Sequence, residues 1–299
     1  MNLPTHLYPW TGRRLDLGGL SLHYLDEGQG PPVLCVHGNP TWSFYYRALV
    51  RELSADHRVI VPDHIGCGLS DKPGDDRYEY TLSRRIADLG ALVDHLGITK
   101  DLTLVVHDWG GAIGLGMAES RPELVRRLVV LNTGAFPLPP AKSLPFLLWL
   151  ARDTGVGSLL VRRFNAFSRG AAALCTTRRK LDPEVRRGLT APYEPAENRL
   201  ATLRFVQDIP LGPEHRAWAA VKAIEASLPR YRELPVLLCW GMKDFVFDHH
   251  FLERFVEEWP AAEVLRLDDA GHYVLEDAPE EVVPRIRAFL DAHPLEPRA

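Results

Sequence analysis

The chain has 299 residues, of which 46% are hydrophobic and 25% charged, and its formal net charge is −4. This length suffices for one large core or two ordinary domains, and the negative charge argues against general affinity for nucleic acid. The longest apolar run, LPFLLWLA at 144–151, is far shorter than the roughly 20 residues of a membrane-spanning helix. We find no secretion signal and therefore expect a cytoplasmic protein without a membrane span.

Alternating strand and helix patterns follow one another along the chain. Residues 13–28 contain two alternating stretches separated by glycines, which predicts an antiparallel hairpin. Near-continuous apolar runs then predict strands that are buried on both faces of a parallel sheet. These runs are 32–38, 57–64, 102–108, 125–132, 234–241 and 262–269. Helices are predicted at 81–97, where Thr81 is placed to cap, and at 280–293, where Pro284 is a candidate to shorten the helix. The alternation predicts an α/β fold with a mostly parallel central sheet flanked by helices.

The alternation stops between 136 and 213, where there are several prolines, helical apolar spacing around 157–167 and no convincing buried strand. Such a stretch is too long for a loop in a compact domain. We therefore predict a helical cap at 136–213, inserted between a first core part, 1–135, and a second, 214–299. The cap carries 12 Lys and Arg against 6 Asp and Glu. This excess is either ordinary solvated surface or a docking face for an acidic partner.

The sequence predicts neither disulfides nor a metal site. The four cysteines lack CxxC spacing, and two of them fall in predicted buried strands, so we interpret them as reduced thiols. They are Cys35, Cys67, Cys175 and Cys239. Asp248, His249 and His250 resemble a set of metal ligands, but adjacent histidines are expected to point apart. No metal and no cofactor is predicted.

Residues 106–111, VHDWGG, join a predicted strand to a helical stretch and place Asp108 at the turn. A sharp strand-to-helix turn is where α/β-hydrolases present a nucleophile. A carboxylate that attacks an sp³ carbon forms an ester, which can be broken again, whereas serine would form an inert ether. Asp108 is therefore predicted to open a strained ring or displace a leaving group. Val106 stands where a small residue is usual.

Two later residues complete the order of catalytic groups in this type of fold. Asp244 follows the run 234–241, and His272 follows the run 262–269. Because parallel strands end at the same edge of a sheet, both side chains are expected to reach the nucleophile. We predict that His272 is the base and Asp244 its orienting carboxylate. Asn132 holds the alternative position of the acid but carries no charge.

A third element is HGNPTW at 37–42, which follows the first long predicted strand. The loop at this place normally supplies part of an oxyanion site. The side-chain amide of Asn39 and the indole N–H of Trp109 are predicted to be two neutral donors for an anion. Attack by aspartate releases such an anion, either a halide or a carboxylate freed from a ring. His107 is expected only to pack beside the turn.

These residues resemble the haloalkane dehalogenase superfamily, with Asp108, Asp244 and His272 as the triad and Asn39 and Trp109 as the anion pair. The position of the acid together with Asn39 is similar to the third dehalogenase subfamily. Other phrases more closely resemble the β-lactone decarboxylases of bacterial long-chain olefin biosynthesis. These phrases are NTGAFPLP (132–139), FNAFSRGAA (164–172), APYEPAENRLATLRFVQDIPL (191–211), DFVFDHHFL (244–252) and DAGHYVLED (269–277).

The resemblance implies an α/β-hydrolase fold and an enzyme that converts a cis-3,4-dialkyl β-lactone to a cis-alkene and carbon dioxide. Asp108 would attack either the carbonyl carbon or the ring carbon that bears oxygen. The implied partners are a small hydrophobic substrate with alkyl chains and an assembly with the thiolase, ketoreductase and β-lactone synthetase of the pathway. Aromatic residues of the cap are candidates to enclose the chains. They are Phe136, Phe146, Trp149, Phe164, Phe167 and Phe205.

Three other functions stay open on the sequence alone. A haloalkane dehalogenase would use the same five residues, with His272 activating a water that cleaves the alkyl ester. An epoxide hydrolase shares the aspartate nucleophile but needs cap tyrosines, and Tyr193 is the only tyrosine between 136 and 213. A non-catalytic ligand receptor would be favoured by a decayed triad, but all three residues are intact.

Overall fold

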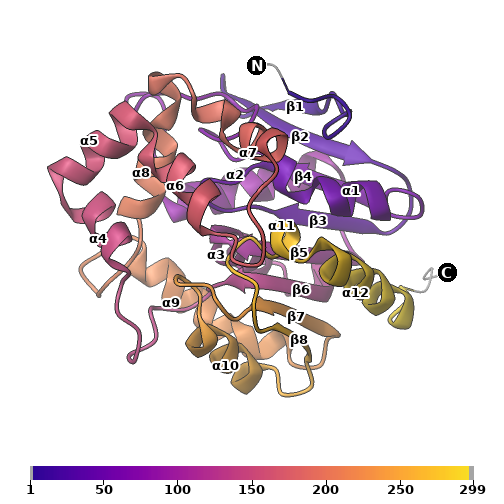
Figure 1. Ribbon diagram of the computed structural model, residues 1–299. Helices are drawn as coiled ribbons and strands as arrows, with labels where there is room; N and C mark the ends of the chain where they lie inside the picture. Colours follow the sequence, from indigo (N-terminus) through magenta and orange to yellow (C-terminus); the bar gives the residue numbers. More distant parts are fainter. Residues whose placement is uncertain (1–2, 296–299) are drawn as a thin grey trace.

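The computed structural model describes residues 3–295, and its centre is an eight-stranded sheet with the order β1-β2-β4-β3-β5-β6-β7-β8 (Figure 1). The strands β1 and β2 form the predicted antiparallel hairpin, β2 pairs antiparallel with β4, and β3 to β8 are parallel. The bounds are β1 (Arg13–Asp16), β2 (Ser21–Glu27), β3 (Pro32–Val36), β4 (Arg58–Pro62), β5 (Leu102–Asp108), β6 (Val125–Thr133), β7 (Val236–Gly241) and β8 (Glu263–Leu267). All six predicted strands are present. The expected burial on both faces is wrong for β8, which is the edge strand and exposes Val264 and Arg266.

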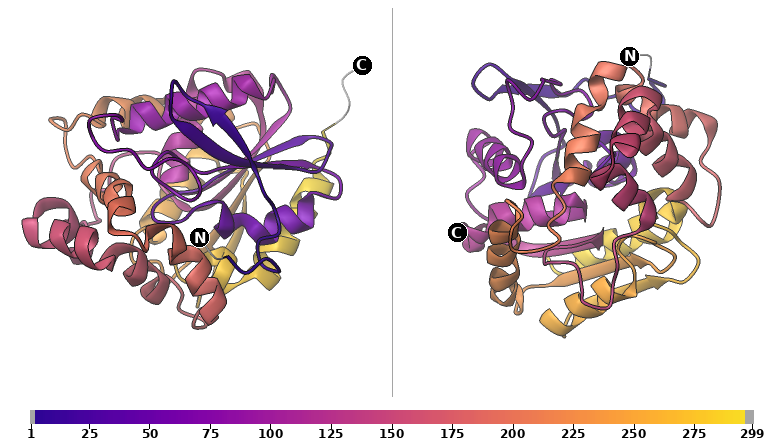
Figure 2. Two further views of the ribbon diagram at one scale, coloured as in Figure 1. Left: turned by 90° about the horizontal axis from the view of Figure 1, so that it is seen from above. Right: turned by 90° about the vertical axis from the view of Figure 1, so that its left-hand side faces the viewer.

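Helices cover both faces of this sheet (Figure 2). Leu34 and Leu104 face one side, in a hydrophobic cluster with residues of α2, α3, α9 and α10. Val33 and Val105 face the other side, in a cluster with residues of α1, α11 and α12. The bounds are α1 (Arg47–Leu53), α2 (Leu82–His95), α3 (Trp109–Glu119), α9 (Trp218–Ser227), α10 (His249–Glu258), α11 (Val274–Asp277) and α12 (Pro279–Ala292). Because neither face of the central strands meets water, these strands appear in the sequence as continuous apolar runs.

The two helices predicted from amphipathic spacing are present. At the start of α2, the hydroxyl of Thr81 accepts a hydrogen bond from the backbone N–H of Arg84 at 3.2 Å, as a capping residue does. The suggestion that Pro284 shortens α12 is wrong, since the helix continues through it. Proline removes one donor, but Pro284 lies on the exposed face, where water can bind the carbonyl of Glu280 that is left free.

The connection from β6 to α9 is helical and lies at one end of the sheet, at the left of Figure 1. The bounds are α4 (Phe146–Asp153), α5 (Gly155–Phe164), α6 (Ala166–Leu174), α7 (Pro183–Thr190) and α8 (Leu200–Gln207). The spacing around 157–167 spans two of these helices, because Asn165 adopts a left-handed φ of 55° and ends α5. No helix within residues 3–295 is long and apolar enough to cross a membrane.

Much of the excess positive charge of residues 136–213 is paired with acidic side chains elsewhere in the same chain. Arg178 forms ion pairs with Asp269 and Glu281 beside α12, and Arg204 of α8 pairs with Asp75. Part of the positive charge of residues 136–213 therefore complements the acidic remainder of the chain. Surface ion pairs of this kind contribute little stability each.

Candidate active site

Asp108 stands at a strained turn between β5 and α3. Its φ of 53° and ψ of −128° lie outside the regions that a non-glycine residue prefers, as in a nucleophile elbow. The turn lies close to β3: a Cβ at Gly110 would collide with the carbonyl oxygen of Val36, and one at Gly38 would collide with the Asp108 carboxylate. The bulk of Val106 is accommodated because α3 carries Gly114, where a Cβ would lie 2.9 Å from the Val106 side chain.

The two carboxylate oxygens of Asp108 have different neighbours. Oδ1 accepts a hydrogen bond of 2.5 Å from the backbone N–H of Asn39. Oδ2 lies 3.5 Å from Nε2 of His272, and Nδ1 of His272 lies 2.7 Å from Oδ2 of Asp244. The structure therefore brings the three predicted triad residues together, although they come from the ends of β5, β7 and β8. One oxygen is fixed by an amide and the other faces the imidazole.

Asp244 is held by groups that sequence reasoning did not assign. The side-chain amide of Asn132 donates to Oδ2 of Asp244 at 2.9 Å, and the N–H of Val246 donates to Oδ1 at 2.7 Å. Asn132 is itself fixed, because its amide oxygen accepts from the N–H of Gly241 at 2.8 Å. The position of Asn132 at the end of β6 was the available signal, but an uncharged residue there did not suggest a supporting role.

Neighbouring carboxylates control the charge of His272. Burial alone would lower its pKa, but Asp244 and the hydrogen-bonding carboxylate of Asp108 raise the pKa to about 10. The two carboxylates therefore favour the charged imidazolium form of His272 near neutral pH. Burial and the adjacent His272 lower the pKa of His107 to about 3, so His107 is neutral. Its Nε2 lies 2.9 Å from the carbonyl oxygen of His272, which means that His107 also orients the triad instead of only packing.

The raised pKa predicts a dependence of stability on pH. Exposed histidine has a pKa of about 6.5, so below that pH both the folded and the unfolded chain hold the proton and the full stabilisation is present. The stabilisation is lost as the pH rises from there through the folded pKa of about 10. Urea unfolding from pH 7 to 10 is expected to show a steeper loss of unfolding free energy for the wild type than for His272→Gln. Equal slopes would assign the pH dependence to other groups.

The predicted anion pair lies beside the nucleophile, and Asn39 has a second task. Asn39 and Trp109 both line the cavity that contains Asp108. One hydrogen of the Asn39 side-chain amide is donated to the carbonyl of Thr202 in α8 at 3.0 Å, which leaves the other hydrogen for a ligand. The indole ring of Trp109 packs against Phe205, with 5.6 Å between ring centroids. The loop after β3 is thus tied to the helices above it.

The cavity has a volume of about 270 Å³ and is mostly apolar. Among the residues that the structure describes, Asp108 and His272 are its only lining side chains with a carboxylate or an imidazole. Cys175 also lines the cavity, but burial raises the pKa of its thiol well above the ordinary value. All four cysteines are buried and unpaired. The cavity therefore places one carboxylate and one imidazole against mostly apolar walls.

The walls differ from the aromatic lining that the sequence suggested. Of the six aromatic candidates, Phe136 and Phe167 line the cavity. Phe146, Trp149 and Phe164 instead point outward and are exposed. The remaining lining from α4 to α6 is aliphatic, with residues Leu147, Leu148, Leu150, Ala151, Gly157, Leu160, Val161, Ala166, Gly170, Ala171 and Leu174. Helical spacing alone did not tell which side of each helix faces inward.

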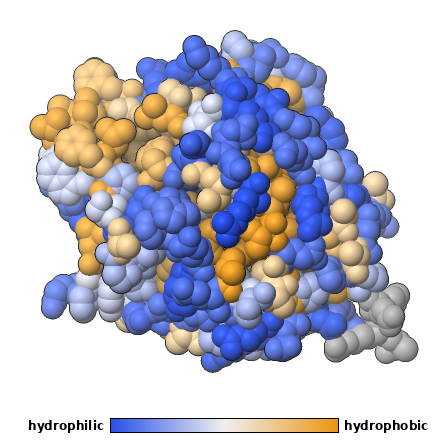
Figure 3. Space-filling model, turned by 60° about the horizontal axis from the view of Figure 1, so that its bottom comes forward, coloured by the Kyte–Doolittle hydropathy of each residue, from blue (hydrophilic) through white to orange (hydrophobic). Residues whose placement is uncertain are grey.

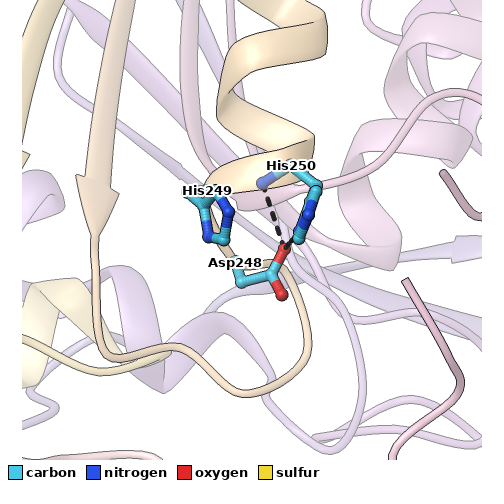
Figure 4. Close-up of side chains that lie close together, drawn as sticks. All are labelled: Asp248, His249 and His250. Atoms are coloured by element: carbon cyan, nitrogen blue, oxygen red, sulfur yellow. Dashed lines mark hydrogen bonds and ion pairs between the residues drawn. The ribbon is translucent and has the colours of Figure 1, made fainter. Parts of the chain in front are cut away.

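Asp248, His249 and His250 place possible ligand atoms within 4.8 Å of one another (Figure 4). The expectation that adjacent histidines point apart was wrong, because their ring centroids are 3.9 Å apart. The geometry is nevertheless that of a helix cap: Oδ1 of Asp248 accepts from the N–H of His250 at 3.1 Å at the start of α10. Lys142 lies 2.7 Å from the other oxygen of Asp248. This ammonium and the positive helix end both disfavour a metal cation.

Comparisons with known proteins agree with this geometry. Residues 31–279 match the family model of the alpha/beta hydrolase fold. A cis-3-alkyl-4-alkyloxetan-2-one decarboxylase of Shewanella oneidensis is 53% identical over 284 residues, covering 95% of this chain and 89% of the relative. One of Xanthomonas campestris pv. campestris is 49% identical, covering 96% and 98%. The crystal structure of haloalkane dehalogenase DbeA from Bradyrhizobium elkani matches with a TM-score of 0.80 and 29% identity, covering 94% and 98%.

Proposed function

The chain belongs to the alpha/beta hydrolase fold family and, within it, to the cis-3-alkyl-4-alkyloxetan-2-one decarboxylases, and we infer that Asp108 is the nucleophile of this reaction. The enzyme is a carbon–carbon lyase that converts cis-3,4-dialkyl β-lactones to alkenes and carbon dioxide. One observation supports the role of Asp108 above all others. Its carboxylate stands in an apolar cavity, with an amide N–H on one oxygen and the imidazolium of His272 at the other.

We propose that Asp108 attacks the ring carbon that bears the ring oxygen. This step forms a bond between Oδ2 and that carbon and breaks the carbon–oxygen bond of the ring, so the lactone becomes a free carboxylate. The carboxylate then leaves as carbon dioxide. The electrons of its carbon–carbon bond form the double bond, and the ester oxygen departs to restore the Asp108 carboxylate. No proton or water enters the overall reaction.

The stereochemistry favours this point of attack. Backside attack inverts the ring carbon, and loss of the carboxylate and the ester from opposite faces is an anti elimination. Inversion followed by anti elimination equals an overall syn loss, so a cis-lactone gives a cis-alkene. Attack on the carbonyl carbon would leave an oxygen on the alkyl chain, and this oxygen would have to depart as hydroxide. The ring-carbon route needs no such leaving group.

Charge stabilisation is assigned to four residues of the site. The backbone N–H of Asn39 holds Oδ1 of Asp108 in place for attack, and its free amide hydrogen and the indole of Trp109 receive the carboxylate released from the ring. His272 provides a positive charge beside the ester oxygen that departs, and Asp244 keeps that positive charge in place. Because no proton is exchanged, an imidazolium suits this task better than a neutral base.

Residues 136–213 are proposed to act as the cap of this site, between the core parts 1–135 and 214–299. The cavity is closed by aliphatic side chains of α4, α5 and α6, which can surround alkyl chains without offering hydrogen bonds. We also propose that the enzyme works in the cytoplasm, in an assembly with the β-lactone synthetase, ketoreductase and thiolase that make its substrate. Sedimentation of the purified proteins together at low salt tests this assembly, and separate sedimentation would contradict it.

Haloalkane dehalogenation is the second candidate, because the same site can form an alkyl ester from a haloalkane. Relatives with that activity in their names are more distant, such as a Mycobacterium tuberculosis protein at 32% identity. Epoxide hydrolysis is disfavoured by the cavity itself. Within the described part of the chain no tyrosine lines it, and the hydroxyl of the buried Tyr193 faces the carbonyl of Thr41 at 3.4 Å.

A labelled substrate tests the reaction and the point of attack together. A synthetic cis-dialkyl β-lactone with ¹⁸O in the ring is expected to give cis-alkene, and all of the label should appear in carbon dioxide. Gas chromatography with mass detection measures both products, and halide release from 1-bromohexane is the comparison. Fast halide release without alkene would favour the dehalogenase. Alkene together with label in water would keep the decarboxylase but place the attack on the carbonyl carbon.

A further inference from the structure

The helices α4, α5 and α6 expose an unusual number of large apolar side chains. Phe146, Leu147, Val156, Leu159 and Phe164 are each more than half exposed, at 68%, 53%, 64%, 58% and 58%. Trp149, Leu160 and Leu174 extend the same surface. We call these eight residues the outer apolar surface. Orange atoms gather there at the left of the space-filling view in Figure 3. An apolar surface of this size is seldom left in water without a binding role.

The outer apolar surface is continuous with the mouth of the cavity. Leu147 of α4, Leu160 of α5 and Leu174 of α6 are exposed and also line the cavity that contains Asp108. These three leucines therefore lie where the cavity meets the outer apolar surface. A ligand that leaves the cavity between them passes directly from one apolar environment to another.

Unpaired positive charge accompanies this surface. Residues 146–174 contain four arginines and one aspartate. Arg152 pairs with Asp153, and Arg169 pairs with Glu194. Arg162 and Arg163 are exposed, and within residues 3–295 neither has an acidic partner at ion-pair distance. Arg163 follows Val156 by seven residues, so the two side chains share one face of α5. Its charge lies within the outer apolar surface.

We propose that the outer apolar surface docks on a lipid bilayer that contains anionic phospholipid. The apolar side chains would enter the boundary between headgroups and acyl chains, while Arg163 binds lipid phosphate, as in other interfacial helices. Arg162 lies on another side of α5, toward Asp75, and adds only to the overall positive charge. The cavity would then open into the bilayer. The docking is inferred from the outer apolar surface alone. That the opening releases a long-chain alkene, which water does not dissolve, rests on the proposed function.

A bilayer fits these observations better than a protein does. A second copy of the chain would bring the same excess of positive charge against itself, which is unfavourable. A protein partner would need its own apolar face there and would cover the opening through which the product leaves. A bilayer supplies negative charge to the arginines, covers the apolar side chains and still accepts an apolar product.

Flotation of the full chain with vesicles tests the proposal. Binding is expected with vesicles of phosphatidylcholine plus phosphatidylglycerol and should be weaker at high salt or without phosphatidylglycerol. The triple variant Phe146→Ser, Leu159→Ser, Phe164→Ser, whose residues do not line the cavity, should bind at least about tenfold more weakly. Arg163→Gln should lose about fivefold on anionic vesicles. Val264→Ser and Arg266→Gln, which change exposed residues of β8, are the matched controls and should bind like the wild type.

Two outcomes overturn the proposal: a wild-type chain that ignores anionic vesicles, and a triple variant that binds them as well as the wild type does. If the upstream synthetase binds this surface and vesicles do not, the surface is instead a docking site for a protein. Turnover of lactone separates docking from catalysis. The triple variant should match the wild type on lactone dissolved in detergent and should be slower on lactone embedded in vesicles. If the wild type makes no alkene in detergent, the proposed function fails, but flotation still tests docking.

Discussion

Replacing Asp108 with asparagine is expected to lower the rate of alkene formation by at least about three orders of magnitude, because the amide oxygen is a poor nucleophile and cannot form the ester. The amide has nearly the same shape, and Asp108 is almost fully buried at the floor of the cavity. The fold and the thermal midpoint should therefore change little. Alkene from a cis-dialkyl β-lactone is measured by gas chromatography, with circular dichroism as the check on folding.

Asp248→Asn is the matched control for this variant. Asp248 is also a carboxylate near the carboxyl edge of the sheet, but it caps α10 and does not line the cavity. Asparagine caps a helix as well as aspartate does, so the control should keep full activity. Alkene formation by Asp108→Asn within about tenfold of the wild type would rule out covalent attack by this residue. The reaction would then have to proceed by binding and strain alone.

Local sequence patterns suffice to bring the three proposed catalytic residues together. Asp108 ends β5, and Asp244 and His272 lie in the loops that follow β7 and β8. Because parallel strands end at one edge of the sheet, this order along the chain already places the three residues together. The elbow was predictable for the same reason. Its two glycines come after Trp109. A side chain at Gly110 would collide with the backbone of β3, and one at Gly111 would collide with Thr133 at the end of β6. Strand periodicity and chain order are properties of the sequence itself.

The remaining features of the site depend on contacts between distant segments. Asn132 and Asp244 are 112 residues apart, and Asn39 and Thr202 are 163 apart, so no local pattern links them. The direction of the cap aromatics was unpredictable for a different reason. In α4 and α5 apolar residues occupy both the inner and the outer face, so Phe146 and Phe164 could not be distinguished from cavity residues by spacing. An amphipathic pattern identifies a buried face only when the other face is polar.

His272→Gln is expected to slow decarboxylation by about a hundredfold without stopping it. In the proposed route the reaction takes up no proton and no water, so His272 supplies only positive charge beside Oδ2 of Asp108. Glutamine removes that charge but leaves the nucleophile and the Asn39 amide. A haloalkane should behave differently, because breakdown of its ester requires a water activated by the histidine. With 1-bromohexane the variant should therefore stop after one alkylation, seen as an added hexyl mass on the intact protein.

Asp244→Asn tests the same electrostatic role through the pKa of His272. Asp244 is the leading cause that raises the pKa of His272 to about 10 against the effect of burial. Without its charge, the upper limit of the pH range in which alkene forms should move toward neutrality, while activity at pH 6 falls only about tenfold. The pH profile thus tests whether the imidazolium is the active form. A lactone-derived ester that accumulates on His272→Gln without any alkene would show instead that proton or water transfer is required, and the electrostatic role would be abandoned.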